Sequence, residues 1–183
     1  MPPPTTIDTV AEYHLPHERF HANSIEFCRL VKDVITHAAQ SGVSLPISPL
    51  MLDIAIGIIS STDANVIIET FIKRSAIHWN AIHAKDIQFF RTKGLDVFNG
   101  LPEAQVQAFN SLFDMKDREG RPIIDAETLD EFWSFFHSFV KIAVCHIHLQ
   151  RKPDPTTKKY TQTYFGDISI KKQVDQWQIR ELK

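Results

Sequence analysis

The chain has 183 residues, of which 43% are hydrophobic and 23% are charged. This balance is that of an ordinary globular domain and excludes wholesale disorder, collagen-like repeats and low-complexity sequence. The formal net charge of -2 excludes a chain that binds DNA or anionic membranes through its overall charge. Only six glycines are present, which disfavours antiparallel β folds and favours helices.

The first residues, 1–13, begin with a triple proline and show no sustained hydrophobic period, which predicts an extended N-terminal arm. They lack the pattern of a secretory signal, and the longest apolar run in the chain is far shorter than the ~20 residues of a membrane span. Cys28 and Cys145 lie in apolar runs and are too few for a disulfide framework. We therefore expect a soluble intracellular protein, cytoplasmic or nuclear.

Residues 14–150 carry helical patterns that predict an all-α domain, a bundle of five helices. Over 17–40 apolar residues recur at steps of three and four, and Gly42 follows as a C-cap. Ser48 and Pro49 predict a cap and a first turn for the next helix. Because residues 50–59 are apolar on nearly every side, this second helix is expected to be central and buried.

A longer helical stripe runs from residue 64 to about 91, and Gly94 is expected to end it. Pro102 predicts the start of a short helix that reaches Phe113. Asp125 is expected to cap the last helix, over about 126–150, which has the strongest apolar stripe in the chain.

The segment 151–183 has a different character, with eight Lys or Arg residues against four Asp or Glu. Its net charge is therefore +4, and residues 1–150 carry the balance of -6. Alternating residues between Tyr160 and Ile170 predict a hairpin around Gly166, so we expect a small, basic, β-containing C-terminal extension. Residues 171–182 fit a helix or a strand equally well.

One candidate metal site is formed by three N-terminal histidines, His14, His17 and His21. On a helix, His17 and His21 are four residues apart and share a face, as metal ligands require. No His-Glu-x-x-His motif accompanies them, so a polar helix start is the favoured interpretation. A metal-dependent enzyme that uses these histidines is the second alternative function.

Two further patterns resemble functional sites only in part. Cys145 and His148 could meet on a helix, but no nucleophile turn or second cysteine pair accompanies them, which favours a polar helix end. The acidic loop from Asp114 to Glu127 resembles a calcium-binding loop, but it spans fourteen positions where the motif has twelve. No glycine-rich phosphate motif is present, and we expect no catalytic residues and no cofactor.

Basic and aromatic residues are interleaved in the C-terminal extension. They are Lys158, Lys159, Tyr160, Tyr164, Lys171, Lys172 and Trp177. Such aromatics could stack on single-stranded bases while the lysines contact phosphates, so nucleic-acid binding is the first alternative function. The same pattern also describes a small sheet whose edge lysines discourage strand addition.

Pairs of adjacent phenylalanines, Phe89 with Phe90 and Phe135 with Phe136, cannot both face one helical stripe. One member of each pair should meet a second surface, either another helix of the same core or a partner chain. The favoured function is accordingly a non-enzymatic structural or adaptor protein, with a protein partner or further copies of itself.

Two runs, from Ile68 to Phe90 and from Gln173 to Ile179, resemble small helical proteins encoded by large double-stranded DNA viruses. The resemblance covers about half of the chain and includes no diagnostic motif, so it assigns no functional residue. It implies a virion-associated or host-interacting role.

Overall fold

The computed structural model describes residues 16–94, 97 and 103–150 of the chain. Within them the chain is helical and forms no named strand, which confirms the all-α class for this part. In chain order the elements are α1 (Pro16–Gln40), α2 (Pro49–Ser61), α3 (Ala64–Ser75), the 3₁₀ turn η2 (Ala76–His78), α4 (Trp79–His83), α5 (Ile87–Thr92), α6 (Glu103–Ser111), the 3₁₀ turn η3 (Leu112–Asp114) and α7 (Ala126–Gln150). The expected arm over 1–13 and extension over 151–183 lie outside the described residues.

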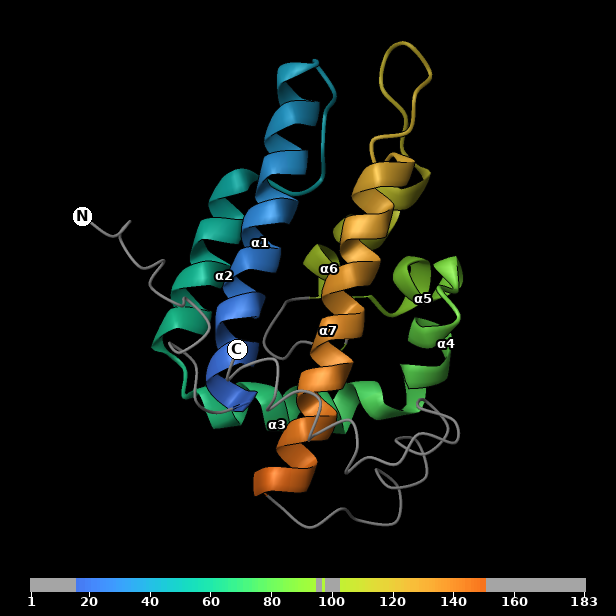
Figure 1. Ribbon diagram of the computed structural model, residues 1–183. Coiled ribbons are helices and arrows are strands. Elements are labelled where there is room, and N and C mark those ends of the chain that lie inside the picture. The colour runs from blue at the N-terminus through green and yellow to red at the C-terminus, as the bar shows by residue number, and fades with distance from the viewer. Residues whose placement is uncertain (1–15, 95–96, 98–102, 151–183) are drawn as a thin grey trace, which may run out of the picture.

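The two longest helices, α1 and α7, lie side by side and run in opposite directions (Figure 1). On the other side of α1 lies α2, while α3 crosses the end where α1 begins and α7 ends. The shorter helix α4 packs against α7. The core lies between these elements and is rich in phenylalanine, with Phe27 in contact with Phe132, Phe136 and Phe139 of α7.

The ends of the long helices follow from local chemistry. At the C-terminus of α1, Gly42 adopts φ 75°, and its N–H donates to the carbonyl of Ala39 at 3.0 Å. This left-handed conformation is easily adopted by glycine, so the expected C-cap is confirmed. At the start of α7, the carboxylate of Asp125 accepts a hydrogen bond from the N–H of Thr128 at 2.8 Å, which confirms the expected N-cap.

The single helix expected over 64–91 is wrong, because the chain breaks there into α3, η2, α4 and α5. The indole N–H of Trp79 donates to the Ser75 hydroxyl where the helix tightens. Lys85 then adopts φ 51°, and the Asp86 carboxylate caps α5 through the N–H of Gln88. The five-helix count is corrected accordingly: the described part of the chain contains seven α-helices.

The expectation that residues 50–59 form the central buried helix is also wrong. In α2 only Leu52 is buried, whereas Leu50, Ile54 and Ile58 are 66%, 56% and 54% exposed. One side of α2 rests on α1, and another side is open to solvent. The apolar composition of α2 therefore reflects an uncovered surface as well as a packed one.

The adjacent phenylalanines are met by the core of the same chain. Phe89 and Phe90 are both buried, and each packs against Trp133 and Phe136 of α7. Phe135 is half-buried, and its ring contacts Phe27. Of the two surfaces considered for these pairs, another helix of the same core is the one observed.

Among the described residues, no single helix has the length and apolarity needed to cross a membrane. The bent pair formed by 49–61 and 64–83 meets that requirement only when its two parts are taken together, with an angle of 113° between them.

Candidate functional site

Of the three candidate metal-binding histidines, the two that the structure describes, His17 and His21, do not converge. His21 donates from Nε2 to the carbonyl of Ile59 in α2 at 2.8 Å. The ring of His17 lies instead near His146 of α7, with 6.2 Å between ring centroids. Within 16–94, 97 and 103–150, no group of three or more His, Cys, Asp or Glu side chains is placed to hold a metal ion. His14 lies outside the described residues.

Residues near the end of α7 are more buried than the sequence indicated. His146 is buried, and its Nε2 lies 2.9 Å from Oε1 of Glu69 on α3. Cys145 is buried as well. The expectation of a polar helix end is therefore wrong at these two positions. The sequence did contain an indication that His146 is buried, because this residue follows Phe139 and Ala143 on the buried stripe of α7.

The acidic loop before α7 is held together by its own residues. The carboxylate of Asp117 accepts hydrogen bonds from the backbone N–H groups of Glu119 and Arg121 and from the Arg121 guanidinium. These hydrogen bonds lower the pKa of Asp117 below its usual value, and the one from the Arg121 backbone N–H has the largest effect. The Asp117 carboxylate thus stabilises the turn in which it lies.

The residues proposed for nucleic-acid binding, from Lys158 to Trp177, all lie outside the described part of the chain. The same is true of the hairpin expected around Gly166.

One side of α2 carries three of the five large hydrophobic side chains that are exposed within the described residues. We call it the α2 face and define it as Leu50, Ile54 and Ile58, which follow one another at steps of four residues, together with Gly57, three residues after Ile54. A side chain added at Gly57 would meet no other atom within 4 Å. The only charged residue of α2 is Asp53, and its carboxylate is paired with Lys32 of α1 at 2.6 Å. The α2 face is consequently apolar and carries no uncompensated charge.

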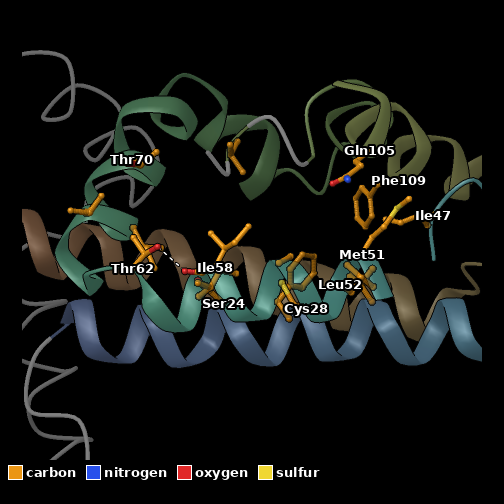
Figure 2. A pocket seen from close by; sticks show the side chains of 17 residues that line it. Ser24, Cys28, Ile47, Met51, Leu52, Ile58, Thr62, Thr70, Gln105 and Phe109 are labelled. Atoms are coloured by element: carbon orange, nitrogen blue, oxygen red, sulfur yellow. Dashed lines mark hydrogen bonds between the residues drawn. The ribbon is translucent and has the colours of Figure 1, made fainter. Parts of the chain in front are cut away.

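A pocket of about 240 Å³ lies behind the α2 face. Figure 2 shows it between α1 and α2 on one side and α3 and α6 on the other. The described lining residues are Ser24, Phe27, Cys28, Val31, Ile47, Met51, Leu52, Ala55, Ile58, Ile59, Thr62, Val66, Ile67, Thr70, Val97, Gln105 and Phe109. None of these side chains is an acid, a lysine, an arginine or a histidine.

The polar side chains that line this pocket are uncharged, and two of their hydroxyl groups already donate hydrogen bonds to backbone carbonyls. The hydroxyl of Ser24 donates to the carbonyl of Phe20 at 2.8 Å, and that of Thr62 donates to the carbonyl of Ile58 at 2.7 Å (Figure 2). Burial raises the pKa of the Cys28 thiol to about 11, so this thiol is protonated near neutral pH. The described lining therefore offers binding by burial of apolar surface, and no ionised group.

Sequence reasoning missed the exposure of the α2 face, because an all-round apolar helix is usually buried. The interruption that hinted at it is Gly57 together with Ser60 and Ser61, which are small or polar residues within the apolar run. The pocket had no sequence signal, since its lining combines residues from segments far apart in the chain.

No protein-family model matches the chain, and neither curated proteins nor solved structures gave a match. Its function must be inferred from its own geometry.

Proposed function

We propose that the chain is a non-enzymatic structural or adaptor protein that acts through protein–protein contacts, with the α2 face as its contact surface. The observation that carries this proposal is the exposure of Leu50, Ile54 and Ile58, each more than half open to solvent on one side of one helix. Contiguous apolar surface of this kind marks interaction sites in folded proteins. Covering it would release about 25 cal/mol for each Å² removed from water.

The shape of the α2 face favours another helix as the partner. Side chains at i, i+4 and i+8 form a ridge that packs into the groove of a second helix. Gly57 leaves space beside this ridge, so that a partner backbone can approach closely. Asp53 at the edge is already paired with Lys32, and no unpaired charge of α2 opposes an apolar partner.

A second copy of the chain is the partner that we propose. A surface without uncompensated charge meets its own copy without charge repulsion, and a two-fold axis near Gly57 would bring the Ile54 and Ile58 side chains of both copies together. A place in a virion, as implied by the resemblance to helical viral proteins, would be one setting for such repeated contacts.

Light scattering on the purified full chain across a concentration series tests this proposal. The wild type should show a mass above that of one chain, and the Leu50→Ser/Ile54→Ser double variant should dissociate at concentrations where the wild type is associated. The matched control is Ile77→Ser, because Ile77 is 60% exposed on η2. Ile77 is separated from α2 by the twelve residues of α3, which span about 18 Å.

Equal dissociation of the control and the double variant would contradict the assignment to α2. A wild-type mass of one chain at every concentration would contradict self-association. Circular dichroism of each variant would establish that the helices remain folded.

A further inference from the structure

We propose that the pocket behind α2 binds a small neutral apolar ligand, of the class of an unbranched hydrocarbon chain of about eight carbons. This site overlaps the contact surface proposed above only at Ile58, which lines the pocket, whereas Leu50 and Ile54 do not. It is formed by side chains of α1, α2, α3 and α6 that meet around a common space (Figure 2).

The volume of the pocket sets the size of the ligand. At about 240 Å³ it exceeds a cavity of about 150 Å³, which in another protein stays dry and binds benzene. If one non-hydrogen atom takes the roughly 30 Å³ that a water molecule occupies in the liquid, the pocket has room for on the order of eight such atoms.

The lining sets the chemistry of the ligand. Ionised groups are absent from its described residues, so a carboxylate or an ammonium inside the pocket would be desolvated without a partner. The Ser24 and Thr62 hydroxyls already donate to helix carbonyls. Gln105 is half-buried on α6, and Figure 2 shows its amide directed toward the space between the helices. It can serve one neutral polar group, such as a hydroxyl, at the end of the hydrocarbon chain.

The pocket also has an apolar approach from the surface. Ile58 and Val66 line it, and both are more than half exposed. They lie on either side of the α2–α3 junction, so apolar surface continues there from the outside of the molecule into the pocket. A hydrocarbon chain can follow this path without leaving apolar surroundings.

Calorimetric titration of the full chain with a series of unbranched 1-alkanols, from four to twelve carbons, tests the proposal. Each methylene that enters the pocket should tighten binding about fourfold, and this gain should stop near eight carbons, when the pocket is full. Octanoate should bind at least tenfold more weakly than 1-octanol at neutral pH, because its carboxylate would lose solvation.

The matched variants are Ala55→Phe and Ala39→Phe. Ala55 lines the pocket, and a phenyl ring there should weaken 1-octanol binding at least tenfold by occupying the space. Ala39 is exposed near the end of α1, and the same change there should leave binding unaltered. Cys28→Leu fills less of the pocket and provides a second variant if Ala55→Phe does not fold.

Three results would overturn the proposal. These are equal affinity in wild type and Ala55→Phe, a gain that continues steadily to twelve carbons, and equal binding of octanoate and 1-octanol. Retained alkanol binding in Leu50→Ser/Ile54→Ser would separate this site from the self-association surface, so that either proposal can fail alone.

Discussion

Phe90 occupies the centre of the aromatic core. It is fully buried, its ring centroid lies 4.2 Å from that of Trp133, and it stacks on Phe113 at 5.0 Å with an interplanar angle of 5°. We expect Phe90→Ala to lower the free energy of unfolding by ~3–5 kcal/mol, because it removes these contacts and leaves a cavity. Urea denaturation measures the change. Phe90→Leu, which fills part of the space, should cost clearly less, and equal costs for the two variants would contradict the packing described.

His137 makes the stability of the fold depend on pH. Its Nε2 donates to the carbonyl of Ile82 at 2.8 Å, and burial, the largest effect, holds its pKa below the usual 6.5. The folded chain therefore binds fewer protons at this site than the unfolded chain does. The contribution of neutral His137 to the stability of the fold is fully present above about pH 6.5, and it is lost as the pH falls through the lowered pKa of His137.

We expect the wild type to lose more stability than His137→Gln between pH 7.5 and pH 5. Denaturant unfolding of both chains at several pH values measures the difference in slope. Parallel curves for the two chains would contradict the assignment to His137.

At the scale of elements, the break between α4 and α5 depends on one residue. Lys85 has φ 51°, a conformation that costs a residue with a side chain about 1 kcal/mol. Its ammonium pairs with Asp130 at 3.0 Å, but both groups are well exposed, so this pair contributes little.

Lys85→Gly should therefore leave the protein unchanged or stabilise it by up to ~1 kcal/mol. The control is Ala84→Gly, because Ala84 has an ordinary φ of -74°, and the same change there should destabilise by ~0.5–1 kcal/mol. Thermal unfolding of the two variants compares them directly. A larger loss for Lys85→Gly than for Ala84→Gly would contradict a turn that is set by the backbone of Lys85.

The elements differ in how far their sequences determine them. The helices α1 and α7 are long and have one apolar stripe, and local caps at Gly42 and Asp125 fix their ends, so both could be predicted. The stretch from 64 to 91 also has a helical period, but its breaks depend on the burial of Trp79 and the turn at Lys85, which are tertiary effects. For α2 the composition indicates a helix and does not indicate which sides are covered.

At the scale of the molecule, the described helices bring the two ends of the domain together. The start of α1 and the end of α7 lie beside α3 (Figure 1). There the ring centroids of His17 and His146 are 6.2 Å apart. Neither the His146–Glu69 pair nor the pocket could be predicted from the sequence. The pair depends on the packing of α3 against α7, and the pocket depends on the packing of α1, α2, α3 and α6. Residue 69 and residue 146, for example, are 77 positions apart.

The two terminal segments are expected to contribute to assembly and not to the stability of the helical body. Deletion of residues 1–13, or of the basic segment 151–183, should weaken association in light scattering and leave the helical circular dichroism and cooperative unfolding intact. Segment 151–183 has a net charge of +4 and the rest of the chain -6, so attraction between copies should also weaken with salt. Unchanged association in both truncated chains would contradict a role for the ends.

The central claim is that two α2 faces meet, and cysteine cross-linking of Gly57→Cys tests it most directly. The native thiols interfere little, because Cys145 is buried and the raised pKa of Cys28 keeps it protonated. Under mild oxidation Gly57→Cys should form a disulfide-linked dimer rapidly and at low protein concentration, whereas the control Ile77→Cys should remain monomeric on a denaturing gel. Equal cross-linking of the two variants, or none at Gly57→Cys, would contradict the claim.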